Sequence, residues 1–188
     1  MNFNNHWQLT GKHAFLSASN PSWLNYNPEK LRTSYLNNQK KEHGTYLHDL
    51  ASRLIKERIK VADFNKAFNQ FVNDCIGFGL SSEVLLYYSD NCFGTADAIK
   101  FDEKTRTLFV FDLKTGDGKP KPQQLLIYSA LFCLEYGKRP KGMTFVTRFY
   151  QGNGYDEILI DPEEVSLCMK KIKEQDKELW NIKEGLEM

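Results

Sequence analysis

Residues 93–116 read FGTADAIKFDEKTRTLFVFDLKTG, and this stretch decides the predicted fold. It covers most of two runs that are rich in β-branched and aromatic residues, 92–101 and 107–115, and the short polar segment that separates them. Such a pattern predicts two antiparallel strands joined by a hairpin turn. If the turn is centred between Lys104 and Thr105, the numbers of any two facing residues add up to 209.

Two carboxylates face each other in that register. The numbers of Asp97 and Asp112 add up to 209, so their Cβ atoms are expected to lie about 4.5–5.5 Å apart. Facing carboxylates repel unless they share a proton or a cation, and oxygen ligands suit Mg²⁺ or Mn²⁺. Lys114 shares a strand face with Asp112 and can orient or deprotonate a water there. Each carboxylate alone is more often a strand-end acceptor, but Gly94 and Gly116 complete a G-x-x-D, D-x-K-x-G pattern that favours the metal site.

Two helices are expected to bring further polar side chains to this pair. Gln124 and Tyr128 stand at i and i+4 in the segment after the hairpin, so they share one face of a helix. His48 lies near the apolar face of an earlier helix. The alternatives are a polar helix rim for the first two residues and a hydrogen-bonded structural histidine for the third.

The rest of the chain predicts elements that complete a mixed sheet. Further strands are expected at 82–88, 143–150 and 157–160. Helices are expected at 28–41, from Thr45 to about 59, at 63–77, 123–136 and 162–183. Thr45 and Asp63 are the expected N-caps of the second and third helices, and residues 1–27 are expected to be irregular, with room for short helical turns. The order indicates a single α/β (α+β) domain over 1–188, with a central mixed sheet flanked by helices.

Composition limits the classes of protein that fit. The 188 residues are 41% hydrophobic and 26% charged, which excludes a wholly disordered chain. The sequence has neither a membrane-length apolar run nor a signal peptide, so a soluble, cytoplasmic protein is expected. The net charge of +1 gives no global attraction to nucleic acid. The four cysteines stand singly, without a C-x-x-C pair to bind zinc or an iron–sulfur cluster.

Taken together, these motifs resemble the RecB-type branch of the PD-(D/E)XK nuclease superfamily, and among its members small phage-encoded RecB-like exonucleases. The likeness covers about residues 15–150. It rests on Gly94-x-x-Asp97, Asp112-x-Lys114-x-Gly116, Gln124-x-x-x-Tyr128 and Gly44-Thr45-x-x-His48, together with Ser17-Ala-Ser19 and Ser82-Glu83.

The resemblance implies a restriction-endonuclease-like core that hydrolyses DNA phosphodiester bonds with a bound metal. It implies an exonuclease of phage or prophage recombination, replication or repair, in a bacterial or phage-infected cell. The implied metal ligands are the side chains of His48, Asp97 and Asp112 and the main-chain carbonyl of Leu113. Lys114 would position the attacking water, Gln124 and Tyr128 would contact the substrate backbone or hold the site together, and Glu83 is an outer-sphere candidate.

The implied cofactor is Mg²⁺ or Mn²⁺, without an iron–sulfur cluster, and the implied partner is DNA, single- or double-stranded. Because no helicase segment is seen, the nuclease is expected to act alone or with a separate recombination, helicase or single-strand-binding partner. Lys119, Lys121 and Arg148 are candidates for binding the strand, with Tyr150 as a stacking platform. The alternative is a catalytically degenerate protein on the same fold that binds nucleic acid or a protein partner.

Overall fold

The computed structural model describes residues 6–9, 11, 14–62 and 66–186. The chain divides into two compact units, residues 1–45 and residues 46–188. The expectation of a single domain over 1–188 stays a prediction. Within the described ranges, the helices that are long enough to span a membrane are too polar to do so.

The first unit is built from short helical turns and the beginning of a long helix. Two 3₁₀ helices, η1 (Trp7–Leu9) and η2 (Pro21–Asn25), lie in the segment that was expected to be irregular. The indole of Trp23 donates a hydrogen bond to the Ser17 carbonyl at 2.9 Å, and the rings of Phe15 and Tyr35 meet edge to face. These contacts fold the segment back onto the first turns of helix α1.

Helix α1 (Pro28–Lys56) is continuous, which corrects the sequence prediction of two helices. Pro28 begins it as expected, but Thr45 lies in its interior and is not an N-cap. The Thr45 hydroxyl donates to the Lys41 carbonyl at 3.2 Å, a bond within the helix. Gly44, which precedes the predicted cap, is buried inside the helix. His48 therefore projects from the middle of a long helix and not from a first turn.

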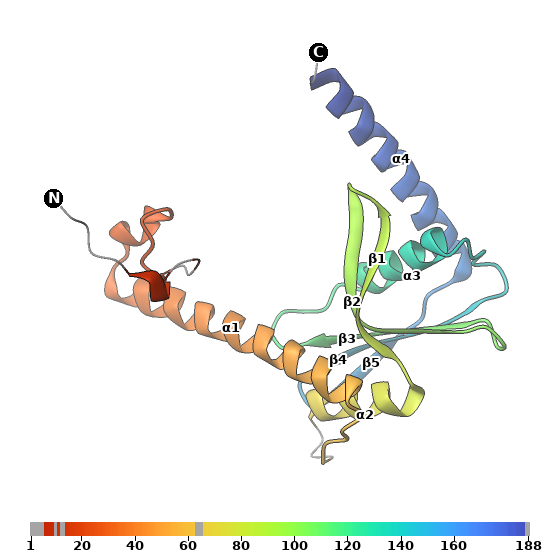
Figure 1. Cartoon of the computed structure of the whole chain (residues 1–188), viewed down its shortest axis with the longest axis horizontal. Helices are drawn as coiled ribbons and strands as arrows, with labels where there is room; N and C mark the ends of the chain where they lie inside the picture. Colours follow the sequence, from red (N-terminus) through yellow and green to blue (C-terminus); the bar gives the residue numbers. More distant parts are fainter. Residues whose placement is uncertain (1–5, 10, 12–13, 63–65, 187–188) are drawn as a thin grey trace. The chain divides into compact units, whose positions relative to one another are not determined.

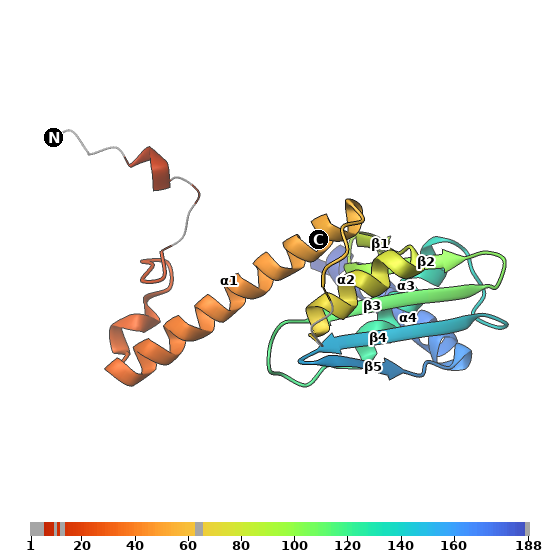
Figure 2. The ribbon, with the colours of Figure 1, turned by 90° about the horizontal axis from the view of Figure 1, so that it is seen from below.

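The second unit contains a five-stranded sheet in the order β1-β2-β3-β4-β5. The strands are β1 (Ser81–Ser89), β2 (Cys92–Asp102), β3 (Thr107–Lys114), β4 (Thr144–Gln151) and β5 (Gly154–Ile158). Strands β3 and β4 are parallel and the other neighbours are antiparallel, so the sheet is mixed as predicted. The helices beside it are α2 (Ala67–Phe78), α3 (Gln123–Glu135) and α4 (Pro162–Leu186) (Figures 1 and 2). Asp63, the predicted cap of α2, lies outside the described residues.

Alternation along β3 separates two apolar layers. Leu108 and Val110 pack with α3 and α4 on one face of the sheet, while Phe111 and Leu113 pack with α2 and the end of α1 on the other. Figure 2 shows α2 over one face and α3 and α4 behind the other. This arrangement confirms a central sheet flanked by helices, and it leaves the last polar residue of β3, Lys114, on the α3 side.

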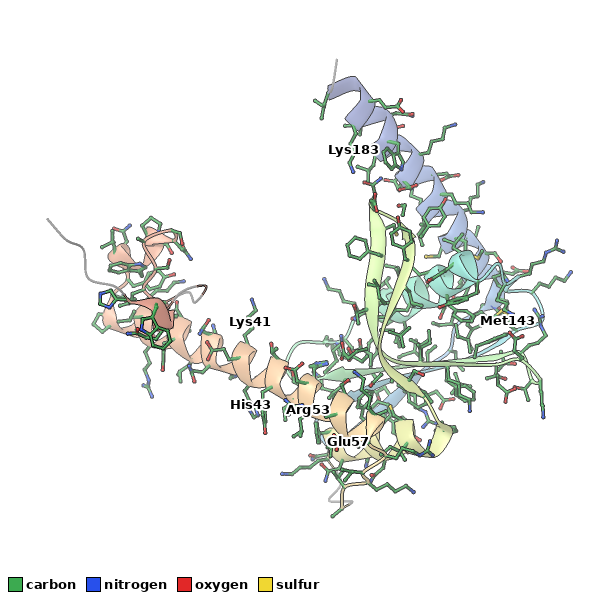
Figure 3. All side chains as sticks on the ribbon, viewed as in Figure 1. Lys41, His43, Arg53, Glu57, Met143 and Lys183 are labelled. Carbon is green, nitrogen blue, oxygen red and sulfur yellow. The ribbon has the colours of Figure 1, made fainter. Side chains whose placement is uncertain are left out.

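The predicted hairpin register is confirmed along the observed β2–β3 ladder. It runs from Asp102 opposite Thr107 to Ala98 opposite Phe111, and each pair of numbers adds up to 209. Beyond Ala98, strand β2 continues with β1 alone as far as the β1–β2 turn. The far end of this turn is tied to α4, where Lys183 donates to the side chain of Asn91 (Figure 3).

Candidate functional site

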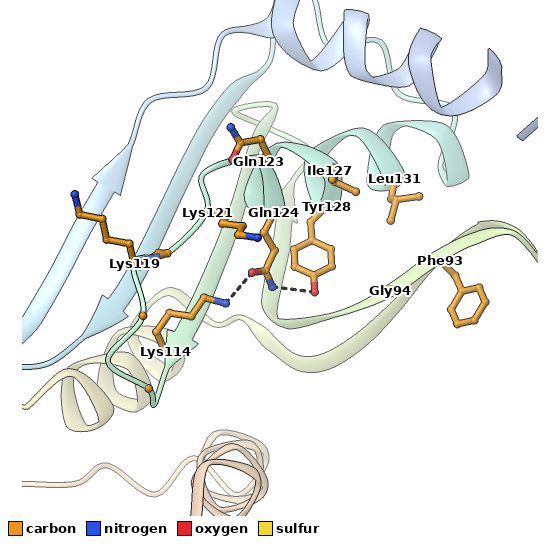
Figure 4. Close-up of a pocket in the computed structure, with 13 residues that line it drawn as sticks. Phe93, Gly94, Lys114, Lys119, Lys121, Gln123, Gln124, Ile127, Tyr128 and Leu131 are labelled. Atoms are coloured by element: carbon orange, nitrogen blue, oxygen red, sulfur yellow. Dashed lines mark hydrogen bonds between the residues drawn. The ribbon is translucent and has the colours of Figure 1, made fainter. Parts of the chain in front are cut away.

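A chain of polar side chains runs from the end of β3 into α3. The Lys114 ammonium donates to Gln124 Oε1 at 2.7 Å, and Gln124 Nε2 donates to Asp112 Oδ1 at 2.8 Å. The same amide nitrogen lies 3.3 Å from the hydroxyl of Tyr128, one turn further along α3 (Figure 4). The structure therefore brings together four residues predicted from sequence, with Gln124 linking the other three.

Tyr128 extends this chain to strand β2. Its hydroxyl donates to the Thr95 carbonyl at 2.7 Å. Its ring passes so close to Gly94 that a Cβ at that position would lie 3.2 Å from the ring carbon Cε1. Only glycine leaves room for the ring without a shift of one of the two neighbours. The glycine of the G-x-x-D pattern thus allows α3 to approach the sheet at the site.

Asp112 is the buried acid of the site, with 1% of its surface exposed. Burial, and next the negative charge of Asp97, raise the pKa of Asp112 to about 6, although the Lys114 ammonium opposes this. Asp112 Oδ2 lies 2.7 Å from Lys114 Nζ, yet this buried oxygen has no partner in hydrogen-bonding geometry. The raised pKa of this buried carboxyl favours its protonated form, and the Lys114 ammonium is the cation that faces its Oδ2.

A second cluster gathers beside this chain. In the described part of the protein, the group of His, Cys, Asp and Glu side chains that can hold a metal ion comprises His48, Glu83 and Asp97, whose ligand atoms lie within 4.8 Å of one another. His48 Nδ1 is 3.4 Å from Asp97 Oδ2. One imidazole nitrogen and two carboxylate oxygens form a donor set that suits Mn²⁺ and, less strongly, Mg²⁺.

The pKa values of two residues in this cluster are shifted by the nearby Asp97 carboxylate. The contact with Asp97 raises the pKa of His48, and burial followed by the charge of Asp97 raises the pKa of Glu83. The His48 shift and the smaller, charge-dependent part of the Glu83 shift both come from the Asp97 carboxylate, whose negative charge a cation would offset. A divalent cation fits this environment on both electrostatic and ligand grounds.

Glu83 has a backbone conformation that the sequence does not reveal. Its φ angle of +53° lies in the left-handed region, although it stands inside strand β1. The neighbouring pairs, Ser82 with Ala98 and Val84 with Ala96, place Glu83 opposite Asp97. A non-glycine residue in this region costs of order 1–3 kcal/mol and is frequent at functional sites. Glu83 was expected only as an outer-sphere candidate, whereas its side chain lies among the potential ligands.

The structure places the side chains of the ligand set predicted from sequence in two groups. His48 and Asp97 lie in the metal-capable cluster, but Asp112 lies outside it and is engaged by Gln124 and Lys114. The main chain of Leu113 joins the two groups, because its N–H donates to Asp97 Oδ2 at 2.8 Å. The direct pairing of Asp97 with Asp112 stays a prediction, because the observed ladder ends at Ala98 opposite Phe111. The charge of Asp97 raises the pKa of Asp112, and Asp97 bonds to the next residue of β3.

The residues expected to bind the DNA strand divide into two groups. Lys119 and Lys121 line a groove next to Lys114. In contrast, Tyr150 is fully buried in the layer under α2, and Arg148 forms ion pairs with Asp74 and Glu157. A buried ring offers no face to a base, so the strand-binding prediction is wrong for Tyr150. The Arg148 guanidinium acts here as an anchor between α2 and β5.

Comparison with known proteins gives no match to any family model, curated protein or solved structure.

Proposed function

We propose that this chain is a Mg²⁺- or Mn²⁺-dependent nuclease that hydrolyses DNA phosphodiester bonds and acts as an exonuclease. The observation that carries the proposal is the contact between two clusters at one point of the sheet. Asp97 belongs to the metal-capable cluster and binds the N–H of Leu113, which stands between Asp112 and Lys114 in sequence. The resemblance to the RecB-type branch of the PD-(D/E)XK superfamily supports the same function.

The proposed ligands are the side chains of His48, Glu83 and Asp97. A divalent cation held there would supply Lewis-acid activation of the phosphate and a water of lowered pKa. Asp97 also fixes the end of β3 through the Leu113 N–H, so the backbone that carries Asp112 and Lys114 is held in register with the ligands.

Lys114 and Asp112 are the proposed catalytic residues. The Lys114 ammonium has three donors, of which one serves Gln124 and one faces Asp112. The third can hold a water or a non-bridging phosphate oxygen. Asp112, with a pKa of about 6, can accept a proton from an attacking water near neutral pH. Gln124 keeps both side chains in place and Tyr128 fixes Gln124 against β2.

Cleavage assays test this proposal. Labelled linear and closed circular DNA, each single- and double-stranded, are incubated with the protein in Mg²⁺, in Mn²⁺ and in EDTA. We expect loss of linear substrate from its ends in either metal, no reaction in EDTA, and resistance of closed circles. Endonucleolytic nicking of circles would contradict the exonuclease assignment. Intact DNA under every metal condition would contradict the nuclease function and favour a protein that only binds.

A further inference from the structure

The groove beside the polar chain has two chemically different ends. It has a volume of about 630 Å³, and its lining contains three lysines and no acidic residue. Lys114, Lys119 and Lys121 lie toward one end, and Phe93 lies at the other, with α3 along one side (Figure 4). A lining of this kind attracts an anionic ligand that also has an apolar face.

The apolar end is exposed to solvent. Phe93 is 59% exposed and Ile127 is 41% exposed, although both are large apolar residues. Both line the groove, as does Tyr128, which lies between them and the lysines. An aromatic ring presented beside a basic track is the arrangement on which proteins stack the bases of single strands.

Because Lys114, a proposed catalytic residue, lines the groove, we propose that the groove holds an unpaired DNA strand, with a base on Phe93 and phosphates along Lys119 and Lys121. This inference rests on the proposed nuclease function and adds the class of substrate. Bases of a duplex are covered above and below by their neighbours, so only an unpaired base offers a face to a side chain. A volume of about 630 Å³ lies within the range of small-molecule clefts and matches a few nucleotides, not a double helix.

The backbone around the groove is fixed in a way that suits this use. Tyr128 holds the hairpin that carries Phe93 through the Thr95 carbonyl. The loop that carries the lysines is held from β4, where Gln151 Nε2 donates to the carbonyls of Gly116 at 2.5 Å and Gly118 at 2.8 Å. Both walls are therefore anchored to the sheet.

Binding measured without cleavage tests the inference separately from the nuclease function. Fluorescence anisotropy in EDTA compares a labelled oligothymidine, which forms no secondary structure, with a duplex of the same length. The variants are Phe93→Ala and the double variant Lys119→Ala/Lys121→Ala. The controls are Tyr87→Ala, which removes the exposed ring paired with Phe93 across the β1–β2 ladder, and Lys104→Ala, which removes an exposed lysine of the β2–β3 turn. Neither control residue lines the groove.

We expect the single strand to bind at least tenfold more tightly than the duplex. Phe93→Ala should weaken single-strand binding by about 5- to 150-fold, the range for loss of one stacked base, without changing the salt dependence. The double lysine variant should flatten the slope of log K against log salt by about 0.7 per lysine. Both control variants should bind as the wild type does.

Equal binding of strand and duplex, or unchanged binding by Phe93→Ala, would overturn the inference even if the protein cleaves DNA. The converse result, Phe93-dependent binding of the strand by a protein that cleaves nothing in metal, would uphold the groove and reject the nuclease function. Because Phe93 is exposed, its replacement leaves no core cavity, and an unchanged thermal midpoint verifies that the variant is folded.

Discussion

The carboxylate of Asp97 accepts a hydrogen bond from the main-chain N–H of Leu113, 2.8 Å away, where strands β2 and β3 stop pairing. The last pair of their ladder is Ala98 with Phe111, so a side chain takes over where a backbone carbonyl would otherwise accept. One residue thus closes the sheet and contributes to the proposed metal site, and these two roles can be separated by substitution.

Asp97→Asn and Asp97→Ala should differ in stability but not in metal binding. Asparagine keeps an acceptor oxygen for the Leu113 N–H, whereas alanine leaves that buried donor unsatisfied at a cost of about 1–3 kcal/mol. Both variants lose the ligand charge, so neither should gain stability when Mn²⁺ is added. Urea denaturation with EDTA and with Mn²⁺ measures both effects. Equal stability of the two variants in EDTA would remove the structural role of this bond.

Lys114→Ala should lower the cleavage rate at least a hundredfold while the Mn²⁺-induced rise in thermal midpoint is retained. The ammonium lies 2.7 Å from Asp112 Oδ2 and does not belong to the metal-capable cluster. Single-turnover cleavage in saturating Mn²⁺ measures the loss, and Lys104→Ala serves as the charge-matched control. A near wild-type rate would exclude Lys114 from the chemistry.

His48→Ala should weaken Mn²⁺ binding and change the metal preference. Imidazole suits Mn²⁺ better than the harder Mg²⁺, so its loss removes the advantage of Mn²⁺ in affinity. Activity should therefore fall further in Mn²⁺ than in Mg²⁺, because the two carboxylates that remain are ligands that suit Mg²⁺. Calorimetric titration with each metal checks the affinities. Unchanged affinity and activity would make His48 a structural partner of Asp97 only.

The stability of the metal-free protein should depend on pH through Asp112. Its pKa is about 6 in the folded chain and about 3.9 in an unfolded one, so the folded state binds more protons between these values. Stability from this group is therefore greatest below about pH 4 and is lost as the pH rises toward 6. The free energy of unfolding of wild type minus that of Asp112→Asn, measured in EDTA, should fall through this window and then level off. A difference that rises with pH would mean that the Lys114 ion pair outweighs burial.

Glu83→Asn should stabilise the metal-free protein more than Glu83→Gln does, by about 1 kcal/mol. Both substitutions remove a carboxylate next to Asp97, but only asparagine readily adopts the left-handed backbone found here. For a chain of this size, such a gain corresponds to a rise of about 2–4 °C in thermal midpoint. Both variants should lose the additional stabilisation by Mn²⁺. Equal midpoints of the two variants would show that the backbone at this position is unstrained.

Local sequence patterns predicted the mixed sheet and the part of the candidate site formed by Gln124 and Tyr128. The polar turn and the alternation along β3 gave the hairpin register on the condition that the turn is centred between Lys104 and Thr105, and the observed ladder meets this condition. A shift by one residue would turn every apolar side chain to the wrong face. The i, i+4 spacing likewise placed Gln124 and Tyr128 together. These features depend on contacts near in sequence, which a single chain reveals.

Features that depend on distant packing were missed. Thr45 suggested a helix start, but residues on both sides continue the helix, and the buried Gly44 is tolerated there. The residue type of Glu83 does not reveal its left-handed backbone, because glycine or asparagine usually occupies such a position and glutamate rarely does. Tyr150 and Arg148 were predicted to contact the DNA strand because one is aromatic and the other is charged. In the structure, α2 covers that face of the sheet and contacts both side chains.

The unusual backbone of Glu83 has a consequence for how this sequence diverges. Selection for folding alone favours replacement of this glutamate, since the strand is easier to form without it, while selection for the site opposes that change. Descendants that abandon the chemistry should therefore lose the glutamate early and exchange it for glycine or asparagine, even where the neighbouring strand residues persist. The residue at position 83 then distinguishes descendants that keep the activity from descendants that have lost it.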